Sequence, residues 1–157
     1  MARDWKRTLA NAPNAAVKWL IVRFGRSPGG AQVLEVRGRK SGQVRSTPVN
    51  PLELDGRRYL LSPRGETQWV RNFRAAREAA LRVGNKREPI VLARELADDE
   101  KRSVLRAYLD RWAWQVKGLI DAPKGASDEQ LASIAGRHPV FEIATKSQAV
   151  SHSSERE

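Results

Sequence analysis

The sequence predicts an α+β domain, in which six mostly antiparallel strands form a small barrel or a curled sheet with helices at its periphery. Two hairpin signals predict the antiparallel pairing: Asp55-Gly56 separates two apolar runs, and Gly84-Asn85-Lys86 joins two further strand segments. The third observation is the position of the predicted helices, which come at the start and late in the chain and do not alternate with the strands. This order disfavours a doubly wound fold.

Residues 3–25 are expected to be helical, with a break or a bend near Pro13. The segment combines an apolar face with tryptophan, lysine and arginine side chains. We favour packing of this helix on the core, and the alternative is a helix that lies on an anionic membrane surface. The apolar stretch 17–22 is too short and too charged to span a bilayer. Residues 26–30 are expected to form a loop.

Six strands and three further helices are expected after this loop. The strands are predicted over residues 32–37, 44–54, 57–62, 79–83, 90–96 and 140–144. Pro48 and Pro51 cannot donate to a ladder, so the second strand is expected to be an edge, bulged or irregular there. The helices are predicted over residues 66–77, 98–119 and 127–136. Residues 147–157 are polar and expected to be a disordered tail.

The composition allows one domain of 157 residues and excludes several kinds of site. The chain has no cysteine, which excludes disulfides, thiolate zinc sites and cysteine nucleophiles and fits a cytoplasmic protein. Its two histidines, His138 and His152, leave little for metal binding or for a histidine-based triad. We therefore expect no metal site, and a structural role or none for both histidines.

The net charge of +11 is concentrated in the middle of the chain. Residues 37–87 hold thirteen lysines and arginines against four acidic residues, which gives +9 in about a third of the chain. This excess predicts an anionic partner, which is a phosphorylated cofactor, a nucleic acid or an anionic membrane. Charge alone does not distinguish these partners from a basic surface without a specific ligand.

Two clusters of glycine, serine and basic residues flank the first hairpin. The first is Gly38-Arg39-Lys40-Ser41-Gly42, followed by Arg45 and Pro48, and the second is Ser62-Pro63-Arg64-Gly65, followed by Trp69 and Asn72. A hairpin brings its outer ends together, so both clusters are expected to face one pocket. Free backbone N–H groups beside fixed lysine and arginine charges are suited to bind a phosphate.

These two clusters, at this separation, resemble the motifs of the deazaflavin-dependent nitroreductase family of oxidoreductases. The resemblance is strongest over residues 33–94 and returns at residues 138–141. It implies a split β-barrel related to proteins that bind flavin mononucleotide (FMN), formed by residues 31–146 between an N-terminal helix and loop (1–30) and the tail (147–157). It also implies a reductase that transfers a hydride from reduced coenzyme F420, an 8-hydroxy-5-deazaflavin, to an electron-poor quinone, activated alkene or nitroaromatic.

The resemblance implies a role for each motif position. Arg39, Lys40, Ser41 and Arg45 would hold the phosphate and the acidic tail of the coenzyme; Pro48, Leu60, Ser62, Pro63 and Arg64 would line its ring; Trp69 and Asn72 would fix the ring or the ribityl phosphate region. Ser62 would lie closest to the reacting edge. Ser62 and Tyr108 are the candidate catalytic residues, and Tyr59 or water are further candidate proton donors.

One departure from the family leaves the acceptor open. Some members carry a tyrosine-rich segment over the substrate pocket, whereas the comparable residues 111–115 contain no tyrosine and only Tyr108 lies nearby. FMN is the alternative cofactor. The alternative functions are a non-catalytic module that binds a flavin, a deazaflavin or a tetrapyrrole, and a nucleic-acid-binding domain. The latter is not expected, because no helix-turn-helix and no stacking aromatics on strands are evident. Both a monomer and a homodimer fit the sequence.

Overall fold

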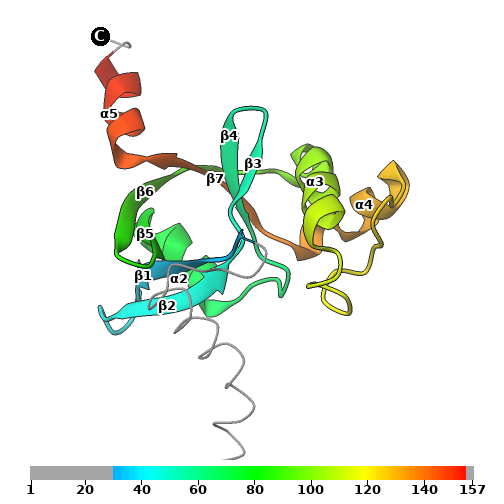
Figure 1. Ribbon diagram of the computed structural model, residues 1–157, viewed down its shortest axis with the longest axis horizontal. Coiled ribbons are helices and arrows are strands. Elements are labelled where there is room, and N and C mark those ends of the chain that lie inside the picture. Colours follow the sequence, from blue (N-terminus) through cyan, green and yellow to red (C-terminus); the bar gives the residue numbers. More distant parts are fainter. Residues whose placement is uncertain (1–29, 155–157) are drawn as a thin grey trace, which may run out of the picture.

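The computed structural model describes residues 30–154, which form one curled antiparallel sheet with helices around it (Figure 1). The strands are β1 (Gln32–Arg37), β2 (Val44–Val49), β3 (Leu52–Leu54), β4 (Arg57–Leu61), β5 (Glu78–Val83), β6 (Lys86–Glu95) and β7 (Val140–Thr145). They follow the spatial order β2-β1-β5-β6-β7-β4-β3, and every neighbouring pair is antiparallel. The predicted α+β split barrel with peripheral helices is therefore confirmed.

The sheet has seven strands and not the predicted six. The segment 44–54, expected as one strand, divides into β2 and β3 at Asn50 and Pro51, which lie outside both strands. Pro51 has no N–H to donate, so the ladder with β1 stops at Val49. The chain then turns to pair β3 with β4, and the expected irregularity becomes a break between two strands at opposite edges of the sheet.

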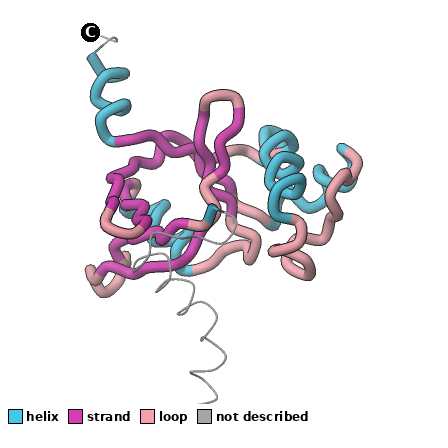
Figure 2. Tube along the Cα trace, in the orientation of Figure 1, coloured by secondary structure: helices cyan, strands magenta, loops and turns pink. Residues whose placement is uncertain are grey.

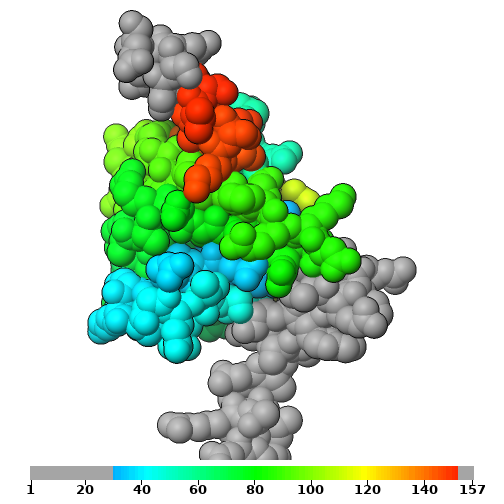
Figure 3. Space-filling view, turned by 90° about the vertical axis from the view of Figure 1, so that its left-hand side faces the viewer, coloured from blue at the N-terminus to red at the C-terminus, as the bar shows by residue number. Residues whose placement is uncertain are grey.

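The curl of the sheet encloses one hydrophobic core (Figure 2). Helix α2 (Gln68–Ala76) contributes Val70 and Phe73, which pack with residues of β1, β4, β5, β6 and β7. The rings of Phe73 and Phe141 meet edge to face, with centroids 5.4 Å apart. In Figure 3, β5 and β6 separate the β1–β2 hairpin from the C-terminal helix, as the order of strands requires.

A second core lies on the other side of β4 and joins it to the late helices. These elements are α3 (Arg102–Trp112), α4 (Asp128–Ile134) and the short 3-10 helices η2 (Asp98–Glu100) and η3 (Ala135–Arg137). Tyr59 and Leu61 point into this second core, whereas Leu60 points into the first, because successive side chains of a strand alternate between its faces. Strand β4 is thus buried on both sides.

The long helix predicted over 98–119 is shorter than expected. It begins at Arg102 and ends at Trp112, so that Val116 and Leu119 lie in a loop. The capping box predicted for the next helix is present: Ser127 and Gln130 exchange hydrogen bonds of 2.9 and 3.2 Å at the start of α4.

The disordered tail predicted over 147–157 is wrong for the described part of that segment. Residues Lys146–Ser154 form helix α5. A second capping box starts it: Thr145 N donates to Gln148 Oε1 at 3.1 Å, and Gln148 N donates to Thr145 Oγ1 at 3.2 Å. Some predictions fall outside the described residues: the helix over 3–25 with its membrane alternative, most of the loop after it, and the last three residues of the tail. No helix within 30–154 is long and apolar enough to cross a membrane.

Candidate functional site

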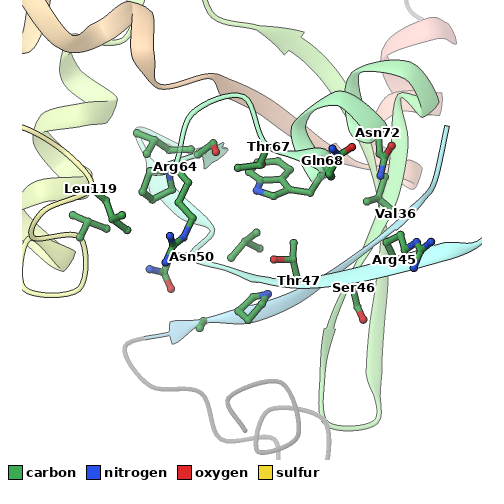
Figure 4. Close-up of a pocket in the computed structure, with 18 of the residues that line it drawn as sticks. Val36, Arg45, Ser46, Thr47, Asn50, Arg64, Thr67, Gln68, Asn72 and Leu119 are labelled. Carbon is green, nitrogen blue, oxygen red and sulfur yellow. The ribbon is translucent and has the colours of Figure 1, made fainter. Parts of the chain in front are cut away.

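A cavity of about 950 Å³ lies where the β1–β2 hairpin, the loop from β4 to α2 and the loop after α3 come together (Figure 4). Eleven of the twelve predicted site residues line it: Arg39, Lys40, Ser41, Arg45, Pro48, Ser62, Pro63, Arg64, Trp69, Asn72 and Tyr108. Both sequence clusters therefore face one cavity, as expected, but the predicted hairpin does not bring them together, because β2 pairs with β1 and not with β4. Its described walls contain four cationic side chains and no carboxylate.

Leu60 is the exception among the predicted site residues. Its side chain has no exposed surface and packs in the first core, while the next residue, Leu61, lines the cavity. The alternation of side chains along β4 explains the difference, because Leu60 and Leu61 point to opposite faces of this strand. Leu61, and not Leu60, therefore lines the cavity.

The basic turn from Gly38 to Gly42 closes the β1–β2 hairpin at one end of the cavity. Gly38 N donates to Gln43 O at 2.7 Å, and Gly42 N donates to Gly38 O at 2.9 Å. A Cβ on Gly38 would lie 2.8 Å from Ser41 Oγ, which can rotate away, and 3.1 Å from the backbone oxygen of Gln43, so a larger residue would crowd the turn there. In this tight turn, Lys40 and Ser41 are both exposed and line the cavity.

Asn72 attaches this turn to helix α2. Its side chain is buried, and its Oδ1 accepts hydrogen bonds from Arg39 N at 3.2 Å and from the Arg39 guanidinium at 2.8 Å. The same guanidinium nitrogen donates to Gln68 Oε1 at 2.9 Å. Arg39 and Asn72 are therefore engaged with each other, whereas Lys40 and Arg45 form no ion pair within the described residues and keep their charges available.

The middle of the cavity is apolar. Val36, Pro48 and Trp69 form part of its wall. Trp69 is half-buried and touches Phe141 edge on, with ring centroids 6.0 Å apart. One part of Trp69 therefore packs on the first core, while the residue also offers a flat apolar wall to a ligand.

The loop that follows β4 is held against residues 138 and 139, which lie between η3 and β7. Ser62 is completely buried, and its hydroxyl donates to Gly65 O at 2.7 Å. Ser62 N donates to Pro139 O at 3.0 Å, and Ser62 O accepts from His138 Nδ1 at 3.2 Å. Because a carbonyl oxygen can only accept, Nδ1 of His138 carries the proton. These bonds hold Pro63 and Arg64 at the cavity wall.

Tyr108 and two residues that the sequence did not single out form a polar end of the cavity. Asn50 Nδ2 donates to Tyr108 OH at 3.3 Å and to Gln115 Oε1 at 2.8 Å. Tyr108 is 2% exposed, and its burial raises the pKa of the phenol, against a smaller lowering by the Asn50 hydrogen bond. Figure 4 places Asn50, Arg64 and Leu119 at the opposite side of the cavity from Arg45 and Asn72.

Thr67, directly before α2, also lines the cavity. Its hydroxyl oxygen is buried and has no hydrogen-bond partner within the described residues. Buried polar groups are nearly always paired, so an unpaired one in a cavity wall indicates a place for a ligand or a water. The only sequence signal for Asn50 is its place between two prolines. Thr67 is the N-cap residue of α2, although it makes no side-chain capping bond.

The curled sheet and its helices define the chain as a split β-barrel protein. The model of the family described as F420H(2)-dependent quinone reductase matches residues 5–117, which is more than half of the chain. The chain belongs to this F420H(2)-dependent quinone reductase family. No curated protein matches it.

Two solved structures share the fold at low sequence identity. One is a domain-swapped dimer with a TM-score of 0.50 and 16% identity, over 92% of this chain and 100% of that chain. The other is a protein of unknown function from Agrobacterium tumefaciens with a TM-score of 0.52 and 18% identity, over 87% of this chain and 56% of that chain. At such identities, the likeness supports the fold alone.

The first prediction concerns the attachment of the basic turn. Asn72→Leu removes the oxygen that accepts both Arg39 bonds, and we expect it to lower the free energy of unfolding by about 1–3 kcal/mol. Asn72→Asp keeps two acceptor oxygens beside the Arg39 guanidinium and should lose much less. Urea denaturation gives the stabilities, and hydrogen exchange of the 38–42 amides reports the turn itself. Equal losses in both variants, with unchanged exchange in the turn, would contradict the role of Asn72.

The second prediction concerns His138. Burial lowers its pKa below the ordinary 6.5, and the nearby charges of Lys101 and Arg137 lower it further. The unfolded chain therefore binds this proton first as the pH falls, so the stabilisation is complete above about pH 6.5 and decreases as the pH falls towards the lower pKa of the folded state.

We expect the melting temperature to fall more steeply between pH 7.5 and 5.5 in the wild type than in a His138→Asn variant. The introduced amide would keep a donor for Ser62 O but would not titrate. His152 is present in both proteins, so its contribution cancels. Calorimetry at matched ionic strength makes the comparison, and parallel pH slopes would show that His138 does not titrate in this range.

Proposed function

We propose that this chain is a reductase that binds coenzyme F420 in the cavity and reduces an electron-poor small molecule, with quinones as the first candidates and activated alkenes and nitroaromatics next. Membership of the F420H(2)-dependent quinone reductase family supports the coenzyme and the reaction class. The observation that carries the assignment to this cavity is its polarity: free cations at one end, apolar walls in the middle and a buried phenol at the other end.

The residues present fit such a coenzyme. A volume of about 950 Å³ lies within the usual range for cofactor sites. Lys40 and Arg45 are free to form charge-assisted hydrogen bonds to a phosphate and an acidic tail, and Ser41 adds a neutral donor. The apolar walls suit a planar ring, and the unpaired Thr67 hydroxyl offers that ring or its side chain a hydrogen bond.

The geometry refines the roles suggested by the resemblance. We assign the phosphate and tail to Lys40, Ser41 and Arg45, and assign to Arg39 and Asn72 the positioning of the turn that carries them. Pro48, Ser62, Pro63 and Trp69 would line the ring, with Leu61 in place of Leu60. When bound, the reduced deazaflavin supplies the hydride.

Reduction of an acceptor by a hydride also needs a proton, and we assign its donation to Tyr108. The Ser62 hydroxyl already donates to Gly65 O, and Tyr59 is packed in the second core and does not line the cavity. The raised pKa keeps the Tyr108 phenol protonated through neutral pH. The acceptor gains two electrons and one hydrogen with the hydride, its oxygen takes the phenol proton, and water returns a proton to the phenolate.

The third prediction tests the basic end. Lys40→Gln and Arg45→Gln each remove one cation while keeping much of the stem, and we expect each to weaken coenzyme binding about tenfold. Lys86→Gln, at the exposed start of β6 and away from the cavity, is the matched control and should bind as the wild type does. Fluorescence titration with oxidised F420 and, in parallel, with FMN measures the affinities.

If both cavity variants bind F420 as tightly as the wild type does, the assignment of Lys40 and Arg45 to the phosphate is refuted. Tight binding of FMN, without binding of F420, would make FMN the coenzyme in the proposal.

The fourth prediction separates an enzyme from a binding module. The absorbance of reduced F420 should fall steadily when a soluble quinone is added to catalytic amounts of the protein, over many turnovers. Matched reactions without protein and with heat-denatured protein give the background. Binding of the coenzyme without multiple turnovers, with a quinone, an activated alkene and a nitroaromatic all tried, would instead support the non-catalytic module.

Location and assembly stay predictions. We expect a cytoplasmic protein that is monomeric or homodimeric. Residues 3–25 are the candidate segment for contact with an anionic membrane. We retain the predicted division of the chain into residues 1–30, 31–146 and 147–157.

A further inference from the structure

We propose that Asn50 is the positioning residue that keeps the Tyr108 hydroxyl proton directed into the cavity, and that this selects acceptors whose reacting carbon is conjugated to an oxygen that can take the proton. The inference rests on the proposed function for its chemistry. The hydrogen-bond arrangement on which it depends belongs to the protein without any ligand.

The polarity of the hydrogen bond carries the first step. A phenol has one proton to donate and can also accept. Asn50 Nδ2 can only donate, so at 3.3 Å the Tyr108 oxygen is the acceptor. No other hydrogen bond of this hydroxyl occurs within the described residues, and the ring is held by packing in the second core and against Trp112, at 4.8 Å between centroids. The Tyr108 proton thus has no acceptor within the described residues, and because the residue lines the cavity, the proton is directed into it.

Gln115 is the second partner of the Asn50 amide nitrogen that faces Tyr108. Its Oε1 accepts from Asn50 Nδ2 at 2.8 Å, which is the shorter bond of the two. Gln115 is itself held by its backbone, whose N–H donates to Trp112 O at 2.9 Å. The Asn50 amide nitrogen thus donates one proton to Gln115 and the other to Tyr108. These two hydrogen bonds stabilise this orientation of the amide.

The break in the sheet explains why Asn50 can reach these partners. It lies outside β2 and β3, directly before Pro51, and is free of the ladder. Figure 4 shows it on the same side of the cavity as Arg64. No acidic residue lines the cavity within the described chain, so no carboxylate of its wall opposes the phenolate left after the proton is given.

The test uses Asn50→Asp, which has nearly the same shape but the opposite hydrogen-bond polarity. The ionised carboxylate of this variant can only accept, so Tyr108 would turn its proton towards it and away from the cavity. We expect kcat with a quinone to fall about a hundredfold, as for the loss of a general acid, while the affinity for F420 changes less than about twofold. Tyr108→Phe should lose a similar factor, and the double variant should lose no more than either single one.

The pH dependence distinguishes positioning from structural damage. Protonation of the introduced carboxylate at low pH would give back a donor, so kcat of Asn50→Asp should rise as the pH falls, while the wild type and Tyr108→Phe should not show this rise. Asn85→Asp makes the same substitution in an exposed turn away from the cavity and is the control for charge and pH. Wild-type kcat in Asn50→Asp, or an equal loss at every pH, would overturn the proposal.

A measurement on the coenzyme-free protein separates this proposal from the proposed function. Tyr59 and Tyr108 are the two tyrosines of the chain, so in a Tyr59→Phe background an ultraviolet titration follows Tyr108 alone. Because the Asn50 bond lowers the Tyr108 pKa, Asn50→Asp should raise it, and Asn50→Leu should raise it less.

An unchanged titration in a folded variant, verified by circular dichroism, would refute the Asn50–Tyr108 arrangement whatever the activity. If Asn50→Asp does not fold, Asn50→Leu alone decides, since it also removes the donor. Absence of coenzyme binding by the wild type would instead refute the proposed function.

Discussion

The cavity exists because the sheet cannot continue past Val49. Pro51 has no N–H for the ladder, so β2 ends, the chain crosses to the other edge of the sheet, and β3 pairs with β4. The two edges of the curled sheet are therefore not joined by hydrogen bonds. The cavity lies beside β2, whose residues 45–49 line it, and both the basic turn and the polar end open onto it.

Strand β4 connects the cavity wall to both hydrophobic cores. Its alternate side chains enter two different cores, and the loop after it is fixed by Ser62 through three hydrogen bonds, to Gly65, Pro139 and His138. A single short strand thus sets the position of the cavity wall relative to both hydrophobic clusters. Buried atoms that are hydrogen-bonded on several sides resist displacement, which suits a wall that must keep its shape when a ligand enters.

The features that depend on local sequence were predictable. The hairpin turns at Asp55-Gly56 and Gly84-Asn85 and the Ser127 capping box follow from residue types at fixed spacing, and they are present. The α5 capping box is equally local, but the polar composition of residues 147–157 masks the signal from Thr145 and Gln148. The choice between Leu60 and Leu61 needed the register of β4 against both cores, which a run of apolar residues cannot reveal.

The candidate site was predictable only as two clusters that flank one predicted hairpin. Asn50 is separated from Tyr108 and Gln115, its hydrogen-bond partners, by 58 and 65 positions in sequence, so only the folded chain brings them together. The same distance has an evolutionary consequence. The cations Arg39, Lys40 and Arg45 belong to the β1–β2 hairpin, whereas Gln115 and Leu119 belong to a loop on the second core, in which Trp114 is 68% exposed. Under the proposed function, changes at exposed positions of that loop such as Trp114 can alter the acceptor end without disturbing the basic turn.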